Sequence, residues 1–153
     1  LYEALVAGGK RDGATILQAE SAAEMTRRQT TGMHDPAFGV VLERGLGVVI
    51  DSRRVQDGGN WFGNRPSRDT FGHGGVGSSV GFADPENRRV VAIVYNGMLD
   101  HPGIYEAMRL TLANYTKQVQ SPLTTARNRV PMPLAHHKPC GVHCPMVSVT
   151  STS

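Results

Sequence analysis

The first part of the chain carries apolar residues at helical spacing. Leu1 and Leu5 lie one turn apart, and the glycine pair that follows predicts the end of a helix over residues 1–7. The segment Ser21-Ala22-Ala23-Glu24 has the spacing of a capping box, in which the Ser hydroxyl and the Glu carboxylate each accept a hydrogen bond from the other residue's N–H. This pattern predicts a second, short helix over residues 22–29.

From residue 38 the pattern changes to apolar and β-branched runs. Residues 38–42 and 46–50 each predict a strand, interrupted at residues 43–45, after a loop over residues 30–37. The next stretch, residues 51–70, is polar, basic and rich in Gly and Asn. It is long for a plain connection, and such loops are often functional.

A second β region surrounds a strong turn. Asp84-Pro85-Glu86-Asn87 places Asp and Pro at the preferred turn positions, between a glycine-rich run over residues 71–83 and an apolar run over residues 89–95. The pattern predicts a β-hairpin. Apolar residues on one helical face then predict a helix over residues 103–117.

The order of helix, helix, strands, hairpin and helix favours the α+β class, with an antiparallel β-sheet and flanking helices. We expect residues 1–117 to form this domain. Residues 118–153 are rich in Pro, Ser and Thr without periodicity, and we expect a disordered tail. Because no N-cap residue precedes Leu1, the chain is either a shortened recombinant piece or, as we expect, a larger domain cut at a helix.

Composition narrows the function classes. Hydrophobic residues make up 39% and charged residues 19%, as in globular proteins, and the net charge is only +3. Because the basic residues are scattered, we expect no nucleic-acid partner. No apolar run approaches the roughly 20 residues needed to span a bilayer, so we expect no membrane span.

The glycine-rich segment, residues 71–82, holds the candidate chemistry. Gly72, Gly74 and Gly77 formally match a dinucleotide-binding pattern, but that pattern needs a preceding strand and a following helix. The glycines are also compatible with close backbone packing alone. The interpretation we favour is an active-site edge strand, where small residues let a substrate lie against the backbone and free N–H groups face an oxyanion. Ser78 and Ser79 are treated as strand or turn residues, because neither stands in a nucleophile motif.

The segment Phe71-Gly72-His73-Gly74-Gly75-Val76-Gly77-Ser78, with Gly81 to Asn87 and the strand that follows, resembles the serine β-lactamase and penicillin-binding-protein-like family. The resemblance is closest to the class C branch, with its esterase and D-alanyl-D-alanine carboxypeptidase relatives. Residues 1–25 and Gly45-Leu46-Gly47-Val48 resemble the same family, and the resemblance covers about residues 1–117. It implies the C-terminal part of a β-lactamase/transpeptidase-like fold.

The family's third motif, K-T-G or H-T-G, matches His73-Gly74-Gly75. The resemblance implies that His73 binds a substrate carboxylate or tunes its catalytic neighbours, and that the Val76 N–H donates to the oxyanion. Gly74 and Gly75 would line the substrate. Trp61 and Phe62 are candidates for the substrate entrance, with packing as the equal alternative. Since Gly74 replaces a Thr or Ser, esterase-like specificity is favoured over β-lactam recognition.

The family's other two motifs are absent from this sequence. None of its serines is followed by Lys in S-x-x-K, and none of its tyrosines stands in Y-x-N or Y-x-S. The resemblance therefore implies a serine-hydrolase fragment that is inactive alone, acting in the full-length protein on a small ester or amide. The alternative is a non-catalytic binding or structural module. Exposed apolar faces also predict self-association.

A weaker alternative concerns the tail. His136-His137-x-x-Cys140-x-x-His143-Cys144 has metal-ligating residue types, but the spacing is too tight for a standard zinc finger. We expect a solvated tail, no metal site and no cofactor.

Overall fold

A computed structural model of the chain describes residues 1–56, 58–59, 61–63, 66–75, 79–94 and 146–151. The elements along the chain are α1 (Tyr2–Val6), β1 (Lys10–Arg11), β2 (Ala14–Thr15), α2 (Ala19–Thr26), β3 (His34–Asp35), β4 (Val40–Val41), β5 (Glu43–Arg44), β6 (Val49–Ile50), β7 (Phe71–Gly75), β8 (Ser79–Asp84), β9 (Arg89–Val94) and β10 (Met146–Ser151).

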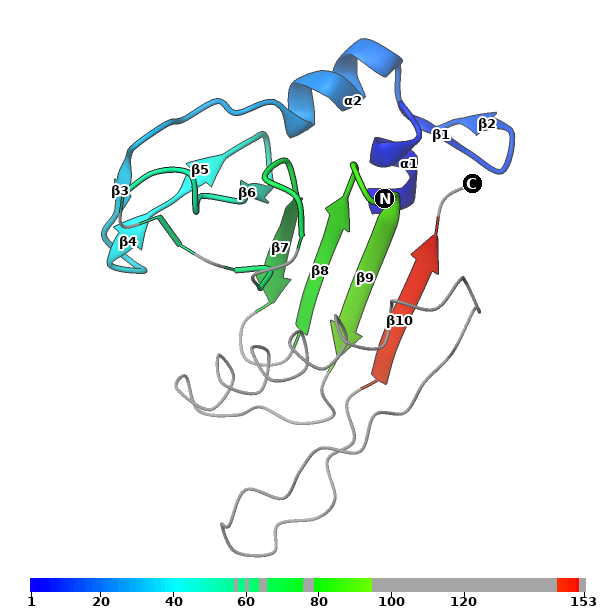
Figure 1. Cartoon of the computed structure of the whole chain (residues 1–153). Coiled ribbons are helices and arrows are strands. Elements are labelled where there is room, and N and C mark those ends of the chain that lie inside the picture. The colour runs from blue at the N-terminus through cyan, green and yellow to red at the C-terminus, as the bar shows by residue number, and fades with distance from the viewer. Residues whose placement is uncertain (57, 60, 64–65, 76–78, 95–145, 152–153) are drawn as a thin grey trace, which may run out of the picture.

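The central sheet has six strands in the order β10-β9-β8-β7-β6-β5, and every neighbouring pair is antiparallel. Figure 1 shows β7 to β10 side by side, with α1 near the end where β8 turns into β9. The predicted mixed fold with an antiparallel sheet is confirmed. Two short hairpins, β1–β2 and β3–β4, lie outside this sheet.

The predicted β-hairpin is also confirmed. β8 and β9 pair from Ser79↔Val94 to Asp84↔Arg89, so the turn joins them directly. The Asp84 carboxylate accepts hydrogen bonds from the Asn87 side chain at 2.7 Å and from the Asn87 N–H at 3.4 Å. A short polar side chain that bonds to the backbone two or three residues on is typical of a tight turn.

The core lies on one face of the sheet. Strand registers place Ile50, Phe71, Ala83 and Val90 in one row, all buried. Leu5 of α1 and Ala22 of α2 belong to the same buried cluster, with Tyr2, Val6, Leu17 and Met25 packed around it. The two helices therefore cover the half of this face nearest the β8–β9 turn.

The opposite face is covered by the loop that leads into β7. The side chains on this face of the sheet alternate along the strands with those of the helix-covered row. They include Phe82 and Val91, both buried. Phe62 is fully buried, with its ring 5.2 Å from that of Phe82. Phe62 thus packs the loop onto the sheet and does not line a substrate entrance, so the packing alternative holds for this residue.

The first helix agrees with its prediction, but the second begins earlier. The Gln18 carbonyl accepts the first hydrogen bond, from the Ala22 N–H at 3.0 Å, so Ser21 lies inside α2 and caps nothing. Glu24 instead pairs with Arg27, whose hydrogen bonds, with one from Gln29, lower the pKa of Glu24 to about 2. Leu17 packs on the core, which fixes the chain just before the helix.

Two further expectations differ from the structure. Glu43–Arg44 does not interrupt the β region but forms β5, paired with β6 through a turn in which Gly47 has φ +77°. Inside the expected loop of residues 30–37, His34–Asp35 forms β3 and pairs with β4. Both strands have only two residues, too few to show a period in the sequence.

The expected tail without regular structure also differs, since Met146–Ser151 pairs with the whole of β9 as β10. The predicted helix over residues 103–117 lies outside the described residues, and so does the rest of the tail up to residue 145. Within the described part of the chain, no helix is long and apolar enough to cross a membrane.

The close approach of β7 and β8 makes a testable demand on Gly72. A Cβ there would lie 2.2 Å from the Gly81 carbonyl oxygen and 2.5 Å from the Phe82 Cβ. We expect Gly72→Ala to lower the free energy of unfolding by about 2 kcal/mol, as overpacking in a core does, measured by urea denaturation. Gly74→Ala is the matched control on the same strand, because its Cβ meets nothing closer than 3.4 Å. Equal stability losses in both variants would contradict this packing.

Candidate functional site

The His-Gly-Gly segment is the part of β7 that pairs with a neighbouring strand on one side only. β8 pairs with all five residues of β7, whereas β6 pairs with Phe71 and Gly72 alone. Among the described residues, therefore, His73 to Gly75 have no strand partner on the β6 side. An extended ligand can hydrogen-bond to such an edge as an added strand.

The His73 ring is exposed and held in one orientation. Its Nδ1 lies 2.6 Å from the Gly74 carbonyl oxygen. Because a carbonyl only accepts, Nδ1 carries the hydrogen, and the lone pair of the neutral ring is on Nε2. This arrangement leaves Nε2 able to accept a proton or a hydrogen bond from a molecule at the strand edge.

Trp61 stands beside this histidine. The two ring centroids are 6.3 Å apart, and the indole carbon Cζ3 would lie 3.4 Å from a Cβ built at Gly74. Phe38 packs edge-to-face on the other side of the indole, with centroids 4.9 Å apart. Gly74 is partly exposed, and its missing side chain gives the indole room.

The structure therefore brings together four of the residues predicted from the sequence. His73, Gly74 and Gly75 are consecutive on β7, and Trp61 lies over Gly74. The fifth, Val76, lies outside the described residues, so its role as oxyanion donor stays a prediction. Gly75 is exposed, and a Cβ there would lie 2.3 Å from the Ser79 hydroxyl oxygen.

Tyr2 joins the first helix to the same strand, on its helix-covered face. A Cβ at Gly81 would lie 2.8 Å from the Tyr2 ring, and this ring lies 6.2 Å from that of Phe71. Burial raises the pKa of Tyr2, partly offset by a hydrogen bond with the His73 backbone. We infer that Tyr2 stays a neutral phenol that packs against β7 and β8.

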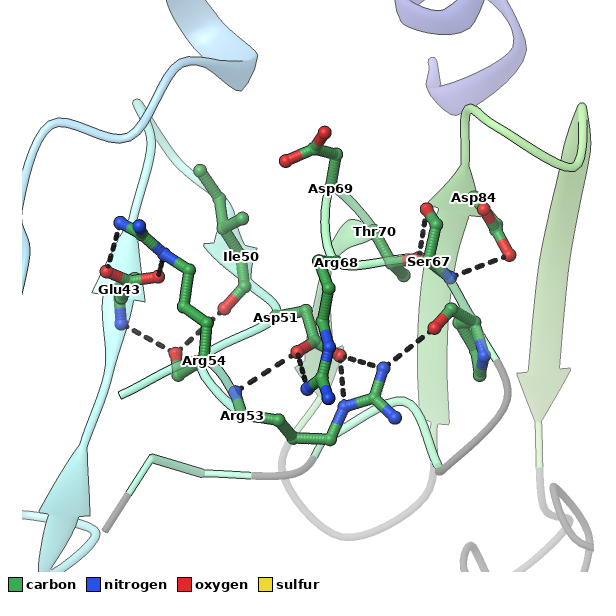
Figure 2. A network of polar contacts seen from close by, with 12 residues as sticks. Glu43, Ile50, Asp51, Arg53, Arg54, Ser67, Arg68, Asp69, Thr70 and Asp84 are labelled. Atoms are coloured by element: carbon green, nitrogen blue, oxygen red, sulfur yellow. Dashed lines mark hydrogen bonds and ion pairs between the residues drawn. The ribbon is translucent and has the colours of Figure 1, made fainter. Parts of the chain in front are cut away.

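A buried carboxylate fixes the start of the loop that carries Trp61 (Figure 2). The Glu43 side chain is fully buried and accepts two hydrogen bonds from Arg54, both at 2.7 Å, and one from Arg28 at 2.9 Å. Burial raises the pKa of Glu43, but the bonds from Arg54 and Arg28 more than offset this effect and hold the pKa below its usual range.

A second buried carboxylate ties the two ends of the loop together. Asp51 accepts a hydrogen bond from the Arg53 Nε at 2.6 Å, and Arg68 lies 3.6 Å from its other oxygen. The same Arg53 donates to the Pro66 carbonyl at 2.8 Å, and the Asp51 N–H donates to the Thr70 carbonyl at 2.8 Å. Figure 2 shows Asp51 between Arg53 and Arg68.

The arginines of this loop do not simply face the solvent. Arg53, Arg54 and Arg68 all pair with buried carboxylates, and Arg65 lies outside the described residues. The signal in the sequence was an acidic residue, Glu43, directly after the apolar residues 40–42, since a buried charge needs a partner. Every buried side-chain polar atom of the described residues has a hydrogen-bond partner.

The described residues also contain no group of three or more His, Cys, Asp or Glu side chains that could hold a metal ion. The His/Cys cluster of the tail, residues 136–144, lies outside the described part of the chain.

Comparison with known proteins places this edge strand in a family. The sequence profile of the β-lactamase family matches residues 2–115, which include α1, the loop with Trp61 and the His-Gly-Gly strand. The chain belongs to the β-lactamase family.

Two relatives can be compared with this chain in identity and in length. It is 32% identical over 134 residues to an esterase/β-lactamase, LipL, of Mycobacterium tuberculosis (strain ATCC 25618 / H37Rv), covering 81% of this chain and 28% of that protein. A crystal structure of a penicillin-binding protein homologue from Caulobacter crescentus is 28% identical with a TM-score of 0.46, over 56% of this chain and 21% of that one. The chain thus spans less than a third of the length of these β-lactamase relatives.

The buried carboxylate of this β-lactamase-family chain gives a stability prediction. We expect Glu43→Gln to lower the free energy of unfolding at pH 7 by about 3 kcal/mol, because it removes the carboxylate that pairs with Arg54 and leaves Arg28 paired with Asp69 alone. The pKa of Glu43 is lower in the folded than in the unfolded chain. Its contribution to the free energy of unfolding is therefore complete above the pKa of the unfolded chain, and it disappears as pH falls through the pKa of the folded chain. Urea denaturation between pH 7 and pH 3 measures the difference.

Glu24→Gln is the matched control, since the Glu24–Arg27 pair is exposed on the surface. We expect no measurable loss from it at pH 7. If the loss from Glu43→Gln were equally small, or independent of pH, the buried ion pairs would not be the source of stability.

A second prediction uses the chain's single tryptophan. Since the Trp61 and His73 ring centroids are 6.3 Å apart, removal of the imidazole should change the surroundings of the indole. We expect His73→Gln to change the wavelength or intensity of the Trp61 emission at pH 7, measured by steady-state fluorescence. His34→Gln should leave the emission spectrum unchanged. An unchanged spectrum in a folded His73→Gln chain would contradict the contact between the two rings.

Proposed function

We propose that this chain forms one wall of the active site of a serine hydrolase that works through an acyl-enzyme, with esterase or carboxypeptidase-like activity. The observation that carries the proposal is the exposed His73 ring, whose Nδ1 is bonded to the Gly74 carbonyl and whose Nε2 has no hydrogen-bond partner among the described residues. A histidine with one nitrogen fixed by a carbonyl is the usual form of an oriented acid–base group.

In this proposal each residue of the His-Gly-Gly strand has one task. His73 binds or tunes the substrate and the catalytic groups through Nε2. Gly74 and Gly75 let the substrate lie against the backbone, and the Val76 N–H donates to the oxyanion. One such donor is worth roughly 3 kcal/mol in other hydrolases.

The substrate class follows from what borders Gly74. A Thr or Ser at this position would offer a hydroxyl to a substrate carboxylate, whereas here an indole edge lies over a bare backbone. A neutral ester fits this surface better than a β-lactam or a peptide carboxylate. The similarity to a protein described as an esterase/β-lactamase supports the same choice.

The proposal also concerns what this sequence lacks. Without S-x-x-K there is no nucleophile to be acylated, and without Y-x-N the proton transfer lacks its tyrosine. We propose that residues 1–117 are the C-terminal portion of a β-lactamase/transpeptidase-like domain, whose preceding part supplies both motifs. The remaining residues, 118–153, stay outside this domain in the proposal, although the pairing of β10 with β9 extends the sheet beyond that boundary.

The test begins with the chain alone. We expect no turnover of p-nitrophenyl acetate or nitrocefin above the buffer rate, and no labelling by a fluorophosphonate. Turnover that a fluorophosphonate abolishes would contradict the proposed lack of a nucleophile.

The second arm uses a longer polypeptide in which, as proposed, a segment before Leu1 supplies S-x-x-K. We expect His73→Gln to lower its kcat/KM for p-nitrophenyl acetate about 100-fold, as loss of acid–base assistance does, while the exposed His34→Gln leaves it unchanged. An upstream segment with no S-x-x-K would instead favour a non-catalytic binding module.

A further inference from the structure

We propose that Phe38 and Trp61 form a binding surface for the aromatic group of an aryl or arylalkyl ester, directly beside His73. This inference rests on the proposed function and adds the class of substrate to it. The two rings pack edge-to-face at 4.9 Å, and the indole is in turn 6.3 Å from the His73 ring. We name this surface the aromatic wall.

The aromatic wall is exposed, although its residues are apolar. Phe38 is 40% exposed, and Trp61 is partly exposed. By contrast, the neighbouring Phe62 is completely buried against Phe82. Adjacent aromatic residues of the same loop thus have different tasks: Phe62 anchors the loop, and Trp61 presents its ring to the strand edge.

Phe38 is held in place by a well-defined turn. The Asp35 carboxylate accepts from the Ala37 N–H at 2.9 Å, and the Asp35 carbonyl accepts from the Gly39 N–H at 2.9 Å. Asp35 also forms an ion pair with Arg44 of β5. The Phe38 side chain therefore projects from a turn that is tied to the central sheet.

Trp61 is supported from behind and from both ends of its loop. The backbone of Gly59 fits between the indole and the side chains of Val40 and Leu42, since a Cβ there would lie 2.8 Å from Leu42 and 3.4 Å from Trp61. The Asp51–Arg53 pair closes the loop through the Pro66 carbonyl. A wall that is ordered before the ligand arrives loses little entropy on binding.

The chemistry of the wall selects its ligand. Aromatic rings attract a further ring in offset or edge-to-face geometry with centroids about 4.5–7 Å apart. The two wall residues carry no charge, and the nearest titratable ring in contact with them is that of His73. A neutral ester whose aryl group rests on Trp61 and Phe38 would bring its polar part toward His73 and Gly74.

The experiment is a titration of the 153-residue chain followed by NMR. Because Trp61 is the single tryptophan, the ¹H–¹⁵N spectrum contains one indole resonance, which reports on the wall directly. We expect benzyl acetate to shift this resonance saturably, whereas ethyl acetate at equal concentration leaves it in place. Phe38→Ala should weaken benzyl acetate binding roughly threefold to tenfold, and Phe38→Leu should weaken it less.

Met33→Ala is the control variant, because Met33 is also an exposed apolar residue and takes no part in the ring contacts that define the wall. Its binding should match that of the unchanged chain. Equal shifts with benzyl and ethyl acetate, or full binding by a folded Phe38→Ala chain, would overturn the inference. Loss of binding in Phe38→Ala that Phe38→Leu partly restores supports it.

The outcomes separate this inference from the proposed function. If the longer polypeptide proves unable to hydrolyse esters while benzyl acetate still shifts the indole resonance, the aromatic wall stands and the hydrolase proposal fails. If hydrolysis depends on His73 but p-nitrophenyl and alkyl esters react equally in Phe38→Ala and in the unchanged protein, the hydrolase stands and the wall fails.

Discussion

Two carboxylates buried under arginines are the constraint on which the candidate site depends. Glu43 and Asp51 are both buried. Glu43 is bonded to Arg28 and Arg54, and Asp51 is bonded to the nearby Arg53, with Arg68 at 3.6 Å. Leaving either carboxylate unpaired in the interior would cost several kcal/mol, so the arginines cannot leave without unfolding the surroundings. The loop over residues 51–70 is thereby closed at its base, and Trp61 reaches the strand edge from a fixed support.

The candidate site lies where the pairing of β6 with β7 ends. β6 accompanies β7 only as far as Gly72, and the residues with candidate chemistry, His73 to Gly75, follow at once. The glycines serve two purposes along this strand. Gly72 permits close packing of two strands, whereas the Trp61 indole lies beside the bare backbone of Gly74. The proposed preference for esters is compatible with membership of the β-lactamase family.

The sequence predicted those features that depend on neighbours along the chain. The β8–β9 hairpin followed from Asp84 and Pro85, and α1 from the spacing of Leu1 and Leu5. The remaining features depend on distant partners. Arg28 binds Asp69, 41 residues away, and β10 pairs with a strand more than 50 residues earlier, distances at which a local pattern carries no information. The Ser21–Glu24 capping box failed because core packing of Leu17 fixed an earlier helix start.

The buried ion pairs position Trp61 next to His73. The most direct measurement is the nuclear Overhauser effect between the Trp61 indole and the His73 imidazole protons, in the unchanged chain and in Asp51→Asn. We expect cross-peaks between the two rings in the unchanged chain. In a folded Asp51→Asn chain these cross-peaks should disappear, while those between Phe71 and Ala83 persist. Cross-peaks that remain undiminished in Asp51→Asn would contradict this role of the ion pairs.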